Sequence, residues 1–241
     1  MTASSALVSH RPAVYAFRDV AHPLRTSVED LIEGLKSFEE GLIAQDPVRK
    51  FLDSTRPSAE ALKPYTFFSD KIYTRNLIYR DKLFEVMAIC WRPGQKTAIH
   101  THNGQLGWMS LAQGDVSVHN YKYISCNAPE NQNVIGIDCL GGATHIELDK
   151  LQTEECAPGC PIYCVDKIQT IHQIECHDSA RAGCVSLHIY SLPIDSCIAF
   201  DMKNQRCYRR TFSYFSQYGK VEVEVEVPQP ADAPLPVQIS R

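Results

Sequence analysis

Short segments rich in β-branched and aromatic residues dominate the chain from Tyr65 onward. Gly, Asn and Pro separate them, and the clearest are IYTRNLIY, FEVMAICW, GWMSLAQGDVSVHNYKY and CVSLHIYS. No helical stretch of useful length lies between these segments, which argues against a parallel βαβ sheet. The sequence therefore predicts a mostly β fold in which antiparallel strands close on themselves as a sandwich or barrel.

The segment before these strands carries helix signals. Ser27 and Asp30 have the spacing of a capping box at the start of a helix. Asp46 followed by Pro47 marks a second start, and Ser58 is a candidate cap for a third, short helix. The expected apolar faces of the first two helices consist of Leu31, Ile32, Leu35 and Phe38, and of Val48, Phe51 and Leu52. We expect these helices to pack outside the main β core.

The length of 241 residues is near the upper end of what one hydrophobic core supports. We therefore expect a single domain over residues 1–241. Its predicted parts are an N-terminal arm (1–26), a helical part (27–64), a β-barrel (65–219) with an irregular loop insertion near 125–164, and an edge strand with a flexible tail (220–241).

Charge and hydropathy indicate which partners to expect. The chain has 24 Lys and Arg against 28 Asp and Glu, a formal net charge of −4, and no basic block that would attract a phosphate backbone. No stretch approaches eighteen uninterrupted apolar residues, and the start of the sequence lacks a basic region followed by a long apolar run. We expect a cytoplasmic monomer that binds neither nucleic acid nor membrane.

Three histidines are candidate metal ligands. His100 and His102 lie two apart at the start of a strand-like segment, so both imidazoles can emerge on one face and bind one ion. The alternative is two surface histidines. His172, flanked by apolar residues in DKIQTIHQIEC, is the candidate third ligand, and the alternative there is a core histidine with hydrogen-bond partners.

A row of polar residues alternates along CVSLHIYS. On a strand, Ser186, His188 and Tyr190 would share one face, and three polar groups inside a barrel would each need a hydrogen-bond partner. Such a row is costly unless it has a function. The alternative is an amphipathic surface strand whose polar side faces water.

These motifs resemble known proteins. Gly94 and Gly114 frame the His-Thr-His motif with a spacing that resembles the first metal-binding motif of the cupin superfamily of small β-barrels. Together with IYTRNL (72–77), AICW (88–91) and VSLHIYSLPIDSCIAFD, the motif resembles the cysteine dioxygenase family, non-haem iron enzymes within that superfamily. The resemblance runs from about Ser27 to Gly219 and leaves out the insertion and the tail.

The resemblance implies a fold and a site. The fold would be a cupin-type antiparallel β-barrel with N-terminal helices, and Fe(II) would be held by His100, His102 and His172. Arg75 matches the arginine that binds the substrate carboxylate, and Tyr73 lies beside it as a further substrate-binding residue. The remaining matches are the hydrogen-bonded row Ser186, His188 and Tyr190, and the pocket residues Trp91, Ile89 and Cys197.

The implied reaction is the conversion of L-cysteine and dioxygen to cysteine sulfinate. Three neutral imidazoles leave Fe(II) with its full charge and with open positions, and a guanidinium fork suits a carboxylate. The alternatives are another small thiol, such as 3-mercaptopropionate or a larger one, and a non-catalytic cupin that binds a ligand. Arg75 favours cysteine, because relatives that prefer mercaptopropionate tend to have glutamine there.

The sequence departs from the family in two places. Mammalian members carry a cysteine that can crosslink to the active-site tyrosine, where this chain has Gly107, as in the bacterial pattern. Four residues after His172 the family usually has asparagine, and this chain has Cys176. Cys156, Cys160 and Cys164 could in principle bind zinc, but Pro and Gly between them prevent a helix from aligning the thiolates, and no fourth ligand has standard spacing.

Overall fold

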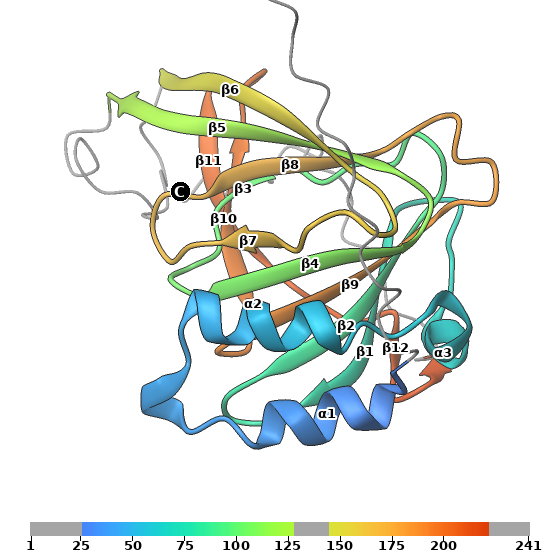
Figure 1. Cartoon of the computed structure of the whole chain (residues 1–241). Helices are drawn as coiled ribbons and strands as arrows, with labels where there is room; N and C mark the ends of the chain where they lie inside the picture. The colour runs from blue at the N-terminus through green and yellow to red at the C-terminus, as the bar shows by residue number, and fades with distance from the viewer. Residues whose placement is uncertain (1–25, 128–144, 222–241) are drawn as a thin grey trace, which may run out of the picture.

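The computed structural model describes residues 26–127 and 145–221, and its strands form two facing β-sheets with helices on one side (Figure 1). The predicted N-terminal arm, apart from its last residue, the middle of the predicted insertion and the tail after residue 221 lie outside the described residues. No helix in the described part of the chain is both long and apolar enough to cross a membrane.

The larger sheet has seven strands in the order β13-β12-β1-β2-β9-β4-β7, and the smaller has six in the order β11-β10-β3-β8-β5-β6. Neighbouring strands are antiparallel except β1 and β12, which pair in parallel over two residues. The strands of the larger sheet are β1 (Thr74–Arg80), β2 (Glu85–Trp91), β4 (Leu106–Gln113), β7 (Tyr163–Val165), β9 (Cys184–Ser191), β12 (Ser216–Gln217) and β13 (Lys220–Val221). Those of the smaller sheet are β3 (Ile99–His100), β5 (Val116–Cys126), β6 (Ile146–Cys156), β8 (Ile171–Cys176), β10 (Ser196–Asp201) and β11 (Arg206–Thr211).

The predicted fold, mostly β and antiparallel with N-terminal helices, is confirmed, although hydrogen bonds between strands do not close the barrel. The hydrogen-bonded strands form two separate sheets rather than one cylinder. Side chains between the sheets hold them together: Met87, Ile89 and Trp91 of one sheet and Val116, Val118 and Ile174 of the other belong to one buried cluster. The apolar contact between two inner faces is what stabilises such a pair of sheets.

The helices cover the outer face of the larger sheet (Figure 1). Ser27 caps the first helix with the predicted capping box, in which Ser27 and Asp30 bond each other's backbone N–H. Ser58 caps the third helix, also as predicted. The helical elements are α1 (Val28–Lys36), α2 (Gln45–Ser54) and α3 (Ala59–Leu62), with 3-10 turns at Glu40–Leu42 and Lys63–Tyr65. Their buried apolar side chains pack against the sheet residues that face outward.

Strand β9 is buried on both faces, along its whole length. Val185, Leu187 and Ile189 pack against the helices, so the alternate residues face the space between the sheets. The row at 186, 188 and 190 therefore lies inside the protein. This excludes the alternative of a surface strand with its polar side in water.

The predicted irregular insertion near 125–164 contains a long regular strand instead. β6 has eleven residues and pairs with β5 as one antiparallel ribbon. Most of its side chains are exposed, because β6 lies at the edge of the smaller sheet. The strand was not predictable from periodicity, since a ribbon solvated on both faces shows no alternation of apolar and polar residues.

Candidate active site

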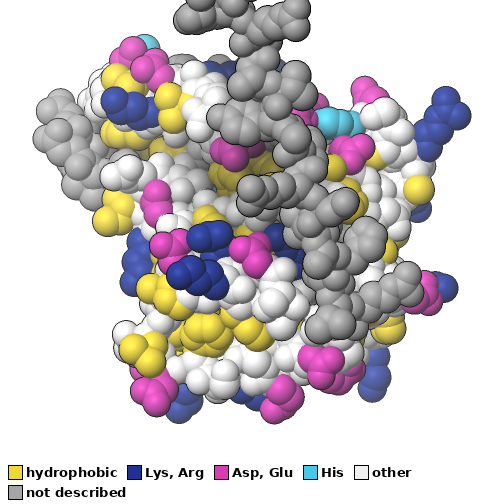
Figure 2. Space-filling view, in the orientation of Figure 1, with side chains coloured by type: hydrophobic (Ala, Val, Ile, Leu, Met, Phe, Trp, Pro, Cys, Tyr) yellow, Lys and Arg dark blue, Asp and Glu magenta, His cyan; other side chains and the backbone are white. Residues whose placement is uncertain are grey.

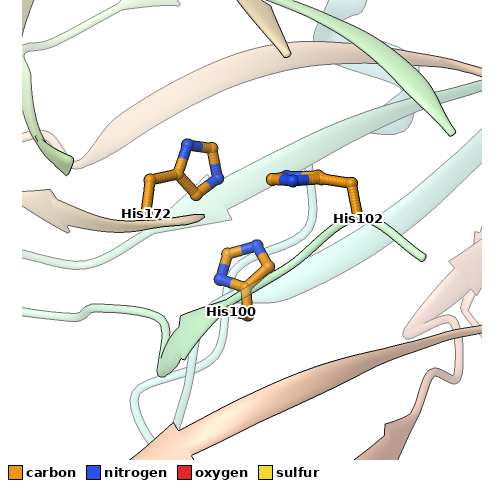
Figure 3. A group of neighbouring side chains, drawn as sticks. All are labelled: His100, His102 and His172. Carbon is orange, nitrogen blue, oxygen red and sulfur yellow. The ribbon is translucent and has the colours of Figure 1, made fainter. Parts of the chain in front are cut away.

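Three histidines converge between the two sheets (Figure 3). His100 ends β3 and lies directly opposite His172 of β8, and His102 follows two residues later. The ring centroids are 4.6, 4.8 and 5.1 Å apart, and the candidate ligand nitrogens lie within 4.8 Å of one another. This is the only group of three or more His, Cys, Asp or Glu side chains in the described residues that could hold a metal ion. Cys156, Cys160 and Cys164 form no such group.

Hydrogen bonds fix the His-Thr-His segment against its neighbours. The backbone N–H of Thr101 donates to the carbonyl of Ile198 in β10, and the Thr101 hydroxyl accepts from the Ile198 N–H. Nδ1 of His100 lies 2.9 Å from the carbonyl oxygen of Ala98, and Nδ1 of His102 lies 3.3 Å from a backbone carbonyl in the loop before β8. Because a carbonyl only accepts, both rings carry their proton on Nδ1 and keep the Nε2 lone pair.

All three imidazoles are neutral at pH 7. Burial lowers the pKa of His100 to about 4 and those of His102 and His172 well below their usual value. Nε2 of His102 is buried and has no hydrogen-bond partner among the described residues. An unpartnered buried nitrogen with a lone pair, beside two similar rings, fits the donor set of a metal site.

Arg75 lies in β1 and is only 9% exposed. Its Nε and Nη2 atoms are buried without a hydrogen-bond partner, and no described carboxylate forms an ion pair with it. The guanidinium carbon lies 4.0 Å from the centroid of the Phe212 ring. A buried guanidinium without a counter-ion is costly, so this arrangement points to an anion that binds here.

The row on β9 forms a hydrogen-bonded relay that also includes Trp91 of β2, which the sequence predicted only as a pocket residue. Nε1 of Trp91 donates to Oγ of Ser186 at 2.9 Å. Oγ of Ser186 lies 2.9 Å from Nε2 of His188, and Nδ1 of His188 lies 3.3 Å from the hydroxyl of Tyr190. The Ser186 hydroxyl has two acceptors within reach, Nε2 of His188 at 2.9 Å and the carbonyl oxygen of Ile89 at 3.5 Å, and the shorter contact favours donation to His188. His188 then donates from Nδ1 to Tyr190, whose own proton stays free for the cavity.

The protonation states agree with this direction. Burial lowers the pKa of His188 to about 3, so the ring is neutral at pH 7. Burial also raises the pKa of the Tyr190 phenol, so the hydroxyl keeps its proton. The centroid of the Tyr190 ring lies 6.2 Å from that of His102, so the relay ends beside the histidine cluster.

A cavity between the sheets unites most of the predicted residues. Its lining includes His100, His102, Arg75, Tyr73, His188, Tyr190, Trp91, Ile89 and Cys197, whereas Ser186 and His172 are not part of the lining. The Tyr73 and Trp91 rings stack with centroids 4.7 Å apart. Burial raises the pKa of the Cys197 thiol to about 12, so it stays protonated.

Sequence reasoning missed several residues of the cavity lining, among them Arg210 and Phe212. They lie two apart at the end of β11, a spacing that puts both side chains on one face. That spacing could have indicated that Arg210 and Phe212 face the cavity together. Most arginines lie at the surface, however, and no motif distinguished Arg210 from them. The Arg210 guanidinium lies 5.9 Å from the Tyr73 ring centroid, so the cavity contains two cationic side chains.

The two departures from the family pattern occupy different places. Gly107 of β4 lies opposite Tyr190 of β9. A Cβ atom at Gly107 would lie 3.1 Å from two carbons of the Tyr190 ring, closer than ordinary van der Waals contact. Cys176 is buried at the end of β8, with its sulfur 2.8 Å from that of Cys184 and away from the cavity.

Comparison with known proteins identifies related sequences. A family model described as "Cysteine dioxygenase type I" matches residues 19–203. Cysteine dioxygenase type 1 from Danio rerio is 27% identical over 80% of this chain and 89% of its own length. The enzyme of the same name from Rattus norvegicus is 29% identical over 80% and 88%. Among solved structures, an RmlC-like cupin protein from Desulfovibrio desulfuricans matches 54% of this chain and 91% of its own with 13% identity and a TM-score of 0.34.

Proposed function

This chain belongs to the cysteine dioxygenase type I family of thiol dioxygenases, and on that premise we propose that it uses Fe(II) to convert L-cysteine to cysteine sulfinate. The overall reaction adds both atoms of dioxygen to the substrate sulfur, so that R–SH and O₂ become R–SO₂H. Membership of the family makes the small-molecule thiol and dioxygen the substrates. Iron and the identity of the thiol are the parts that we propose.

The donor set fits a divalent transition metal. His100, His102 and His172 would hold the ion through Nε2, since each Nδ1 already faces an oxygen atom. The unpartnered Nε2 of His102 supports this assignment. Bound Fe(II) would favour the thiolate form of the substrate and would supply the one-electron chemistry that dioxygen requires.

Arg75 binds the substrate carboxylate in this proposal. Its buried, unpartnered guanidinium offers two parallel N–H groups to a planar anion, and it lines the same cavity as His100 and His102. The carboxylate supplies the missing counter-charge, so binding relieves an uncompensated buried cation. The fork fixes one end of the substrate while the thiol end faces the histidines.

Tyr190 donates its free hydroxyl proton as a hydrogen bond to the reacting groups. Trp91, Ser186 and His188 set its direction, since each member of the relay donates to the next. The raised pKa of Tyr190 supports a role as a hydrogen-bond donor rather than a base at neutral pH. The stacked rings of Tyr73 and Trp91 form an apolar wall that limits water in the cavity.

The observation that carries the proposal is an unpaired guanidinium on the cavity that is also lined by His100 and His102, two of the three clustered neutral imidazoles. Its test is oxygen uptake by the iron-loaded protein with cysteine, 3-mercaptopropionate and cysteamine, together with identification of the products by mass spectrometry. We expect sulfinate formation from cysteine and much weaker turnover of cysteamine, which lacks the carboxylate. Turnover of mercaptopropionate without turnover of cysteine would reject cysteine as the substrate, and a protein that neither binds iron nor turns over any of the thiols would favour a non-catalytic cupin.

The remaining expectations stay predictions. A net charge of −4 supports the absence of a nucleic-acid partner, and we also expect no membrane partner, a monomer and a cytoplasmic location. Size-exclusion chromatography with light scattering measures the oligomeric state. A mass near 27.1 kDa would agree with a monomer.

Replacing Gly107 by alanine should lower turnover without loss of iron. The added Cβ would press on the Tyr190 ring at 3.1 Å and on Val165 at 3.2 Å, so the ring has to shift by a few tenths of an ångström. A displaced Tyr190 hydroxyl should reduce kcat by about 10-fold or more, as small misplacements in active sites do. The measurement is kcat beside the iron content, and an unchanged kcat would show that the position of Tyr190 does not matter for the reaction.

A further inference from the structure

The three candidate metal ligands differ in what holds them. Nδ1 of His100 and Nδ1 of His102 each face a backbone carbonyl, which a side-chain substitution cannot remove. Nδ1 of His172 instead lies 3.1 Å from the hydroxyl of Tyr163, a residue of β7 in the other sheet. His172 is therefore the only one of the three ligands whose ring depends on a side chain.

The hydrogen bonds around Tyr163 have a single consistent direction. The Tyr163 hydroxyl donates to Oδ1 of Asn120 at 2.7 Å, so its oxygen accepts the proton of His172 Nδ1. Nδ2 of Asn120 in turn donates to Oε1 of Glu154 at 2.9 Å. The chain of donors thus starts at the imidazole N–H and ends on an exposed carboxylate, which only accepts when ionised.

Tyr163 and Asn120 are buried, so water does not readily replace the hydrogen bonds that they form. Tyr163 is 8% exposed and Asn120 9% exposed, so water has little access to either polar group. Asn120 lies directly opposite His172 across β5 and β8, which fixes the distance between them by strand register. The rings of Tyr163 and His172 are 5.5 Å apart between centroids. A buried group that lost its partner here would stay unsatisfied.

We propose that Tyr163, Asn120 and Glu154 form a positioning relay that holds His172 in its Nδ1–H tautomer and aims Nε2 at the metal. The relay rests on the proposed function in one respect only, namely that a divalent metal binds the three histidines. Hydrogen bonds of this kind orient a ligand ring and make it a better donor, and their loss typically weakens metal binding by about 10- to 100-fold. Tyr163 touches neither the cavity nor the substrate site, so it is a positioning residue and not a catalytic one.

The first test compares Tyr163→Phe with Tyr79→Phe. Both substitutions remove one phenol hydroxyl that bonds a side-chain oxygen, but Tyr79 bonds Asp81 far from the histidines. The measurement is the Kd for Co(II), obtained by competition with a chelator, and the visible spectrum of the Co(II) protein, which reports ligand geometry. We expect Tyr163→Phe to raise the Kd by about 10- to 100-fold and to change the spectrum, and Tyr79→Phe to do neither. Equal Kd values for Tyr163→Phe and the unchanged protein would overturn the relay.

The second test needs neither metal nor a variant. In the metal-free protein with ¹⁵N-labelled histidine, NMR distinguishes the two neutral tautomers of each ring. We expect His172 to carry its proton on Nδ1, and a proton on Nε2 would overturn the relay even if Tyr163→Phe fails to fold. Failure of the proposed function would look different, since the unchanged protein would then bind no divalent metal or turn over no thiol while His172 kept the expected tautomer.

Discussion

Replacing His172 by alanine should remove iron and abolish turnover together. The substitution leaves two of three imidazoles around the site, and loss of a direct ligand should exceed the about 10- to 100-fold loss typical of a group that only orients one. We therefore expect iron affinity to fall by more than about 100-fold and oxygen uptake with cysteine to reach background. Iron per chain, measured by elemental analysis, and oxygen uptake give the two readouts.

His177→Ala is the matched control for this prediction. His177 lies outside the cavity, where it bonds Ser117 and Glu155. This variant should keep both its iron and its activity. Iron near one ion per chain in His172→Ala would contradict the proposed ligand set, whereas full activity in His172→Ala would contradict any role of the metal site.

Replacing Arg75 by alanine should impair cysteine turnover severely while iron stays bound. Removing one partner of a buried, hydrogen-bonded charge pair costs about 2–5 kcal/mol, which corresponds to a fall in kcat/KM of about 30- to 4,000-fold. Most of the loss should come from KM, because the guanidinium binds a part of the substrate that does not react. Arg75 is not one of the three proposed metal ligands, so the iron content should change little.

Two comparisons make the Arg75 prediction specific. Cysteamine has no carboxylate, so Arg75→Ala should affect its weak turnover far less than that of cysteine. Arg210→Ala tests the other cation of the same cavity, which is half-buried and lies near Tyr73. A larger loss of cysteine turnover in Arg210→Ala than in Arg75→Ala would move the carboxylate site to Arg210.

The sequence was informative where local rules decide the structure. The caps at Ser27 and Ser58 bond the nearby backbone, so they could be predicted from a few neighbouring residues. The alternation on β9 could be predicted because apolar residues cover one face and the other carries the polar row. The cluster of His100, His102 and His172 was expected from motif resemblance, and the structure brings the three rings together.

The rest could not be predicted because it depends on contacts between distant segments. β6 is stabilised by hydrogen bonds to β5 and shows no apolar face. Tyr163 reaches His172 from the other sheet, and no periodicity links β7 to β8. Arg210 enters the cavity through the pairing of β11 with β10, which the sequence does not specify.

The candidate site is divided between the two sheets, so the histidine cluster and the residues proposed to orient the substrate belong to different parts of the fold. His100 and His172 lie on strands of the smaller sheet and His102 lies two residues after β3, whereas Arg75 and Tyr190 belong to the larger sheet. We therefore expect that a change that shifts one sheet relative to the other can keep the three histidines together and still alter their position relative to Arg75 and Tyr190. On the proposed function, substitutions in the helix-backed half alone should then alter which mercaptan is accepted, while the half that carries the histidines stays the same.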